Sequence, residues 1–325
     1  MTSKIFLAFF IAVVISLIGV PIIIKLDKYF SLGKVIRDHG PRKHKKKAGT
    51  PTMGGIAIII AIMSSLFLTG INDPMPIFAM IMLFLFGFIG FIDDWICYRL
   101  KTSVGLTARY KLLLQIIFAV VVGYGVWRLG HDIISPFSLN TTNMYLYLGW
   151  FALIVVASSN SVNLTDGLDG LAAVIYIICS FAFMIIAFAQ GMDNMAIISS
   201  AACGACLGFL WYNFFPAKIF MGDVGSLALG APLGFQALYT KTELLLPFIA
   251  VIFVAETLSV IIQVIYFKIT KGKRIFKMTP LHHHFELSGV HEALITFRFA
   301  IVNALCAGAT LLLYYWMVFK RLQAL

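Results

Sequence analysis

The sequence has few charged residues and few cysteines. Only 12% of its 325 residues are charged, whereas about 25% is usual for a soluble domain. The apolar fraction is 61%, and the mean hydropathy is +0.95. A soluble domain needs far more polar surface, so this composition excludes cytosolic enzymes and disordered chains. The five cysteines lie in mostly apolar surroundings, which favours small core residues over a disulfide framework.

The sequence also lacks the sustained apolar–polar alternation of barrel strands, and has long unbroken apolar runs instead. Because lipid admits only helices or closed barrels, we predict an all-α polytopic membrane protein, a single domain over residues 1–325. About ten transmembrane helices are expected, each near the ~20 residues that cross the hydrocarbon. The predicted spans are 5–24, 54–68, 76–92, 111–129, 145–159, 168–189, 195–213, 225–239, 244–267 and 296–319.

Basic residues are distributed unequally between the two sides of these spans. The loops on one side, at about 25–53, 93–110, 160–167, 214–224 and 268–295, and the adjoining span ends carry 20 of the 25 Lys and Arg residues. Because Lys and Arg accumulate in cytoplasmic loops, we predict that these loops are cytoplasmic and that both termini are extracytoplasmic. The net charge of +11 favours anionic partners, namely acidic lipids, phosphates or nucleotides.

Acidic residues are scarce, and several of them gather at predicted cytoplasmic ends of spans. Carboxylates near the membrane are costly unless they pair, bind a cation or face water. Asp93 and Asp94 are adjacent at the end of the third span. A divalent cation or a shared proton would relieve their repulsion. The alternative is an ordinary solvated helix end.

Two further polar segments precede the sixth and eighth spans. In the first, Asn163 and Asp166 share a face if the turn is helical, and Asp169 follows three residues later. N-capping of the next helix explains one of these residues but not the whole run. In the second, Gly222 and Gly225 bracket Asp223, at a helix start that favours phosphate. No Walker loop is present, and a plain glycine-rich turn is the alternative.

Three consecutive histidines, His282–His284, lie in the long loop after the ninth span. Consecutive side chains on a helix cannot all face one ligand, which makes a three-histidine zinc site improbable. Hydrogen bonding to phosphate and a proton relay are both compatible with them, as is a solvated basic loop. Glu256 falls in the middle of the ninth span, so we expect it to face protein or a polar cavity.

Taken together, these segments indicate phosphoryl chemistry at one membrane face. The segments combine carboxylates suited to a hard cation, glycine turns at helix starts and a basic rim. This combination favours a bound Mg²⁺ that contacts substrate phosphates. An enzyme at this position could join a soluble phosphate donor to a lipid phosphate acceptor. A secondary transporter is the competing class, but transporter sites lie near the bilayer midplane, and no inverted repeat is evident.

Five motifs occur in an order that resembles one enzyme family. They are K-A-G-T-P-T-M-G-G at 47–55, Asp93-Asp94, N-L-T-D-G-L-D-G at 163–170, M-G-D-V-G-S at 221–226 and H-H-H-F at 282–285. This pattern closely resembles the phospho-N-acetylmuramoyl-pentapeptide transferase family, within the polyprenyl-phosphate hexosamine-1-phosphate transferase superfamily. The resemblance runs from about Lys25 to the C-terminus. The motifs P-T-M-G-G and H-H-H-F resemble those of the muramoyl-pentapeptide branch of this superfamily in particular.

The resemblance implies the first membrane step of peptidoglycan synthesis, and hence a part in cell wall biogenesis, cell shape and cell division. Phospho-N-acetylmuramoyl-pentapeptide would pass from its UDP carrier to undecaprenyl phosphate, giving lipid I and UMP, with Mg²⁺ required. The resemblance also implies a multi-pass protein of the bacterial cytoplasmic membrane, with a cytoplasmic active site, a homodimeric state and no nucleic-acid partner. The near alternative is a sister transferase that moves N-acetylglucosamine-1-phosphate onto undecaprenyl phosphate.

The resemblance also implies roles for individual residues. Asp223 would be the principal Mg²⁺ ligand, Asp93 a second ligand and the base towards the lipid phosphate, and Asp94 its support. Lys111 would neutralise phosphate charge, and His283 would be a further catalytic residue. The implied nucleotide-sugar and phosphate contacts are Lys47, Thr52, Asn163, Asp166, Asp169, Asn213, Phe220, Gly222, Ser226, Gln263, His282 and His284, with Phe220 stacking on uracil.

Overall fold

The computed structural model describes residues 2–30, 49–70, 73–102, 104–130 and 143–323, and every regular element in these ranges is a helix. This confirms the predicted all-α class. The helices are α1 (Thr2–Phe30), α2 (Gly55–Thr69), α3 (Pro74–Leu100), α4 (Ala108–Arg128), α5 (Met144–Thr165), α6 (Leu171–Ala189), α7 (Asp193–Asn213), α8 (Gly222–Tyr239), α9 (Leu246–Ile249), α10 (Val251–Ile269), α11 (Leu281–Leu287) and α12 (Glu292–Gln323). The predictions for residues 31–48, including the one for Lys47, lie outside the described residues.

Eight of the described helices are long and apolar enough to cross a membrane, which makes the protein a multi-pass membrane protein. They are α1, α3, α4, α5, α6, α7, α10 and α12. Helix α2 is a shorter apolar helix, at the place of the predicted second span. Helix α8 lies at the place of the eighth predicted span, and a proline and several polar residues lower its apolar character.

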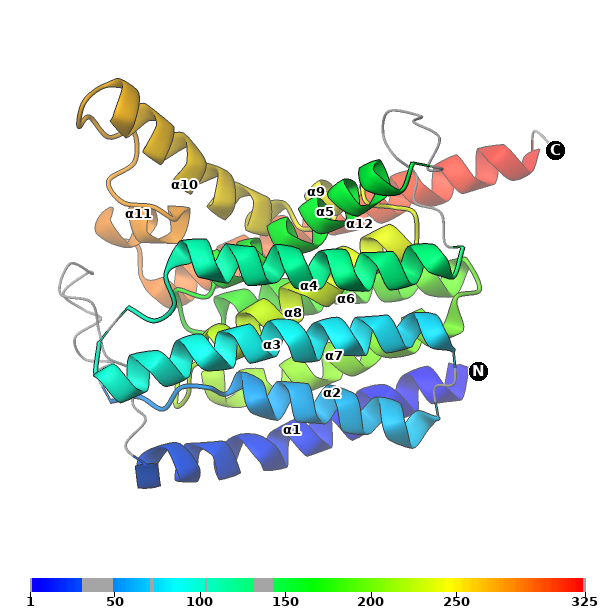
Figure 1. The fold of residues 1–325 in the computed structure, drawn as a ribbon, viewed down its shortest axis with the longest axis horizontal. Coiled ribbons are helices and arrows are strands. Elements are labelled where there is room, and N and C mark those ends of the chain that lie inside the picture. Colours follow the sequence, from blue (N-terminus) through cyan, green and yellow to red (C-terminus); the bar gives the residue numbers. More distant parts are fainter. Residues whose placement is uncertain (1, 31–48, 71–72, 103, 131–142, 324–325) are drawn as a thin grey trace.

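Helix α8 forms the centre of the bundle. Nearly all of its side chains are buried, and it packs closely against α3 and α5. Gly230 and Gly234 allow the approach of α5, because a Cβ at either would meet that helix, and Gly225 allows the approach of Gly55 in α2. Both chain ends lie at one end of the bundle in Figure 1, and α11 lies at the other. The first turn of α8 is therefore fixed by its neighbours on all sides.

Helix α3 extends further than the predicted third span. Its first turn has Pro74, and Asp73 accepts a hydrogen bond from the backbone N–H of Met75 at 3.0 Å. At the other end the helix continues to Leu100, because the rings of Phe91, Trp95 and Tyr98 contact one another at helical spacing. The helix therefore continues past the predicted loop start at 93, and the adjacent aspartates lie within it. Helix α5 likewise continues past the predicted loop start at 160, to Thr165.

The ninth predicted span is two helices rather than one. Helix α9 ends at Ile249 and α10 begins at Val251, with Ala250 outside helical geometry. The side chain of Asn303 in α12 bridges the break. Its Nδ2 donates to the carbonyl of Ile249 at 3.1 Å, and its Oδ1 accepts from the N–H of Ile252 at 3.2 Å. Helix α10 then leans out of the bundle (Figure 1) and exposes one apolar face.

Candidate active site

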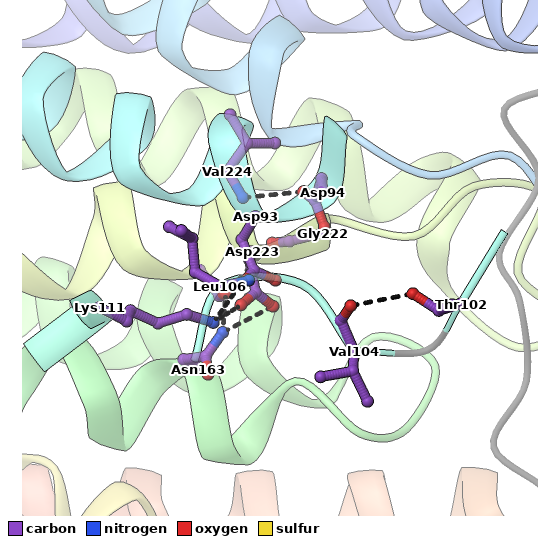
Figure 2. A network of polar contacts seen from close by, with 11 residues as sticks. Asp93, Asp94, Thr102, Val104, Leu106, Lys111, Asn163, Gly222, Asp223 and Val224 are labelled. Carbon is purple, nitrogen blue, oxygen red and sulfur yellow. Dashed lines mark hydrogen bonds and ion pairs between the residues drawn. The ribbon is translucent and has the colours of Figure 1, made fainter. Parts of the chain in front are cut away.

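Three carboxylates from two helices meet at the end of the bundle that carries α11. Asp93 and Asp94 come from α3, and Asp223 lies in the first turn of α8. One oxygen of each lies within 4.8 Å of the others. Figure 2 shows the three side chains close together. Asp93 is 7% exposed, and the other two are partly exposed. Segments that are 129 residues apart in the sequence thus supply one acidic cluster.

A lysine ammonium lies between two of these carboxylates. The Nζ of Lys111 is 2.6 Å from Asp223 Oδ2 and 3.0 Å from Asp93 Oδ1. Lys111 is in the first turn of α4, and the preceding loop folds over the site because the N–H of Leu106 donates to Asp93 Oδ1 at 2.8 Å. The ammonium offsets the mutual repulsion of the two acids. It also shows that a cation fits between them.

An amide and a hydroxyl fix the orientation of the third carboxylate. Asn163 Nδ2 donates to Asp223 Oδ1 at 3.0 Å and approaches Ser226 Oγ at 2.9 Å. Ser226 Oγ in turn donates to the carbonyl of Gly222 at 3.1 Å. These contacts come from the last turns of α5 and the first turns of α8. Besides Lys111, the amide of Asn163 thus holds the Asp223 side chain, and Ser226 holds that amide in place.

Asp94 has a different environment from the other two acids. Its Oδ2 accepts from the backbone N–H of Val224 at 3.0 Å, so it binds the N-terminus of α8, where orphan N–H groups favour an anion. Gly222 allows this contact, since its φ is +74° and a Cβ there would meet the Asp94 carboxylate. Asp94 thus ties α3 to the turn that presents Asp223.

The segment before α2 pairs with the loop before α8 through its backbone. Gly54 N–H donates to the carbonyl of Phe220 at 2.9 Å, and Phe220 N–H donates to that of Pro51 at 2.8 Å. The N–H of Thr52 donates to Asp27 Oδ2 at 2.7 Å, and Asp27 is 3% exposed. Sequence reasoning missed this anchoring role of Asp27. Its one signal was an acid at the start of a basic segment.

Two predicted substrate residues hold the loop between α7 and α8. Asp169 Oδ2 accepts from the N–H of Ala217 at 2.9 Å. Asn213 accepts from Gly170 N–H at 3.1 Å and donates to the carbonyl of Ile219 at 2.8 Å. Both acid and amide are 2% exposed. They join this loop to the turn between α5 and α6, where Asp166 is partly exposed.

The loop between α10 and α12 carries the remaining predicted residues. Gln263 Oε1 accepts from the backbone N–H groups of Ile275 and Phe276, both at 3.0 Å. Its Nε2 donates to the carbonyl of Phe276 at 2.9 Å. Gln263 is only 8% exposed. Its amide therefore fixes the start of this loop, and any contact with substrate stays a prediction.

The three histidines of α11 have three different environments. His282 is fully buried, whereas His283 and His284 are partly exposed. His283 Nδ1 lies 2.8 Å from Glu286 Oε2, and His284 Nδ1 accepts from the N–H of Lys277 at 3.2 Å. The structure thus separates the three side chains, as their consecutive positions require. Their roles towards substrate remain predictions.

The donor set at the acidic cluster fits a hard divalent cation. Asp93 and Asp223 present oxygen ligands on either side of an ammonium, and Mg²⁺ takes carboxylate oxygens and substrate phosphates in preference to nitrogen or sulfur ligands. Within the described ranges, no other group of three His, Cys, Asp or Glu side chains could hold a metal ion. An ammonium group and a helix N-terminus beside such acids are also groups that suit the binding of phosphate.

Comparison with known protein families assigns this helical membrane protein to a class of transferases. A family model described as glycosyl transferase family 4 matches residues 75–241. A signature described as phospho-N-acetylmuramoyl-pentapeptide-transferase signature 1 matches residues 47–59.

Similar proteins of known name indicate which kind of transferase this is. A phospho-N-acetylmuramoyl-pentapeptide-transferase of Halalkalibacterium halodurans is 46% identical, over 95% of this chain and 96% of that protein. A protein of the same name from Clostridium novyi is 44% identical, over 91% of this chain and 92% of its own length. Another from Moorella thermoacetica is 43% identical, over 93% of this chain and 96% of its own length. The chain belongs to the phospho-N-acetylmuramoyl-pentapeptide-transferase family. It is thus a phosphoglycosyl transferase of the membrane.

Proposed function

We propose that this enzyme transfers phospho-N-acetylmuramoyl-pentapeptide from its UDP carrier to undecaprenyl phosphate, forming lipid I and releasing UMP. The observation that carries the proposal is the cluster of Asp93, Asp223 and Lys111, in which one ammonium contacts both acids. The relatives named for this activity match nearly the whole chain. A charged site at the end of an apolar bundle suits one soluble substrate and one lipid substrate.

In the proposed reaction an oxygen of the lipid phosphate attacks the phosphorus bonded to the sugar. The new phosphorus–oxygen bond forms as the bond to UMP breaks, and UMP leaves with the electron pair. Asp93 takes the proton of a lipid phosphate that is still protonated, as a positioned base. Lys111 lowers the repulsion between attacking and attacked phosphates. We favour this direct attack over a phosphorylated aspartate, because a phosphate dianion is already a nucleophile.

Asp223 and Asp93 would hold Mg²⁺, with Asp94 supporting the turn that carries Asp223. When bound, the ion would stabilise the charge that builds up on the diphosphate oxygens. Asn163 and Ser226 keep the Asp223 carboxylate aimed at the cluster. A carboxylate held in this way loses little freedom when it binds its ligand.

The nucleotide-sugar would bind along the loops that surround the cluster, with Phe220 stacking on uracil. The proposed contacts are Lys47, Thr52, Asn163, Asp166, Asp169, Asn213, Gly222, Ser226, Gln263, His282, His283 and His284. Among the described members, backbone and side-chain hydrogen bonds already link Asn163, Asp169, Asn213 and Gln263 to neighbouring loops. Such loops present a preformed surface to a ligand.

We further propose that the enzyme is a single integral domain of the bacterial cytoplasmic membrane, with the site on the cytoplasmic face. The excess of Lys and Arg on that side supports this orientation. Both chain ends lie at the opposite end of the bundle from α11 (Figure 1), in keeping with extracytoplasmic termini. A homodimer in the membrane is part of the proposal.

A substrate comparison tests the proposal. Purified enzyme with undecaprenyl phosphate should release UMP from UDP-N-acetylmuramoyl-pentapeptide, and only when Mg²⁺ is present. UMP release from UDP-N-acetylglucosamine alone would assign the sister activity instead. Ion-driven solute uptake into proteoliposomes without UMP release would reject transferase function altogether. A phosphorylated enzyme trapped with the UDP substrate alone would replace direct attack by a two-step route.

A further inference from the structure

Helix α10 presents a buried polar face to the loop that carries the histidines. Glu256 is fully buried, and Gln263 lies seven residues, or about two turns, further along the same face. Gln263 binds the loop backbone at Ile275 and Phe276. The opposite face of α10 exposes apolar side chains. The polar face of this helix is thus directed at one loop.

Glu256 accepts a hydrogen bond from the backbone of His282 and lies beside the ring of the same residue. Its Oε1 accepts from the backbone N–H of His282 at 3.1 Å, and its Oε2 lies 3.2 Å from the ring Nδ1. Both side chains are 0% exposed. A carboxylate buried to this extent is costly unless it is paired. The hydrogen bond from the His282 backbone supplies that pairing, and the ring of His282 lies directly beside the carboxylate.

The other side of the His282 ring packs against the turn between α5 and α6. A Cβ added at Gly167 would overlap ring Nε2, so only glycine leaves room for the ring. The same segment begins with Asn163, which donates to Asp223. A continuous chain of contacts therefore runs from Glu256 through His282 and this turn to the acidic cluster.

We infer that Glu256 is a positioning residue of the transferase. It holds His282 against the turn at 166–170, and thereby sets where the partly exposed His283 and His284 lie. Glu256 itself is fully buried, and it acts through His282. The kinetic part of this inference rests on the proposed function, whereas its structural part does not.

Kinetics of Glu256→Gln in the full-length protein test the inference. Glutamine keeps the size and an acceptor oxygen for the backbone N–H but removes the charge that faces the ring. We expect the KM for the UDP-sugar to rise about tenfold or more, because small displacements of a substrate loop weaken binding strongly. The KM for undecaprenyl phosphate should not change, and kcat should change less than about threefold. Glu256→Asp, which keeps the charge on a shorter side chain, should give an intermediate KM.

Ser259→Ala is the matched control. Ser259 lies on the same buried face of α10 and donates only to the backbone carbonyl of Glu256, at 2.6 Å. Its removal alters the packing of α10 but leaves the carboxylate and His282 in contact. We expect wild-type KM values for Ser259→Ala. An equal rise of KM in both variants would overturn the inference in favour of general packing.

A second measurement needs no turnover. In protein labelled with ¹⁵N-histidine, the ring signals of His282, assigned by their loss in His282→Asn, should show a proton on Nδ1 and should shift in Glu256→Gln. Backbone hydrogen exchange over residues 275–290 should become faster in Glu256→Gln and not in Ser259→Ala. Unchanged spectra and exchange in Glu256→Gln would overturn the inference. A wild-type enzyme that releases no UMP would defeat the proposed function, while these two measurements still decide the positioning role.

Discussion

The two ends of the bundle bury their acids in different ways. At the end that carries α11, Asp93 and Asp223 share the ammonium of Lys111 at 3.0 and 2.6 Å. At the opposite end, Glu243 lies in the turn between α8 and α9 and is 2% exposed. Its neighbouring cation, Lys241, is exposed to the surroundings. Among the described residues, the acids of the first end thus have a partly buried cation in contact, whereas Glu243 has only the exposed Lys241 nearby.

The difference is reflected in the pKa of Glu243. Burial raises the pKa of Glu243 from 4.5 to about 7, and the indole of Trp150 and the charge of Lys241 lower it by less. A buried acid without a close cation moves towards its neutral form. The acids near Lys111 have such a cation, and they are the ones suited to bind metal and phosphate. We therefore expect the acids around Lys111 to act in the chemistry, and Glu243 to act in the stability of the fold.

The largest expected effect comes from neutralising the acids of the site. Asp223→Asn and Asp93→Asn should each lower kcat by at least ~100-fold, in the range of a lost metal contact or positioned base. Glu243→Gln, assayed in parallel for UMP release, should keep kcat within about twofold, since an acid far from the chemistry adds nothing to the barrier. Near-normal turnover by Asp223→Asn at saturating Mg²⁺ would remove Asp223 from the metal role.

Removal of the shared ammonium should have a smaller and more informative effect. Lys111→Gln should lower kcat by roughly 10–100-fold, because the repulsion between the phosphates is no longer offset. It should also lower the Mg²⁺ concentration for half-maximal activity, since Asp93 and Asp223 lose a competing cation. A Mg²⁺ titration of UMP release measures both. Arg109→Gln, an exposed change on the same helix, is the control, and an unaltered Mg²⁺ requirement in Lys111→Gln would contradict the shared-cation model.

Much of the site could be predicted from the sequence because its chemistry is local. Asp93, Asp94 and Asp223 stood out as acids at the ends of apolar spans, and the structure brings them together. The boundaries were less predictable. Hydropathy cannot show that aromatic contacts continue α3 beyond Asp94, or that Asn303 stabilises a break in the ninth span.

Residues that act through distant backbone groups were the least predictable. Asp27 binds the N–H of Thr52, and Asp169 binds that of Ala217. Neither contact has a signature in the sequence, because a backbone N–H is the same at every residue. Glu256 was expected to face protein or a polar cavity, but its partner, His282, lies 26 residues away in a different helix. Such pairings follow from tertiary packing alone.

The pH dependence of stability should separate the two ends. The Glu243 carboxyl ionises near pH 4.5 when unfolded and at about 7 when folded, so the folded state binds more protons between these values. The free energy of unfolding therefore falls as pH rises through this window and stays low above it. Glu243→Gln mimics the neutral form and should be more stable than wild type at pH 8.5, by about 1–2 kcal/mol, with little difference at pH 4. Thermal unfolding in detergent at both values measures this, and a variant that is less stable at pH 8.5 would contradict it.

The smallest expected effect concerns a second acid at the same end as Glu243. Asp73 caps α3 by accepting from the N–H of Met75 at 3.0 Å, a role that needs an acceptor oxygen and not a charge. Asp73→Ala should lower the free energy of unfolding by about 1 kcal/mol, whereas Asp73→Asn should change it by only a few tenths. Both variants should keep wild-type kcat in the UMP-release assay. A large loss in Asp73→Asn would mean that charge matters at this end too, and would weaken the contrast with the acids around Lys111.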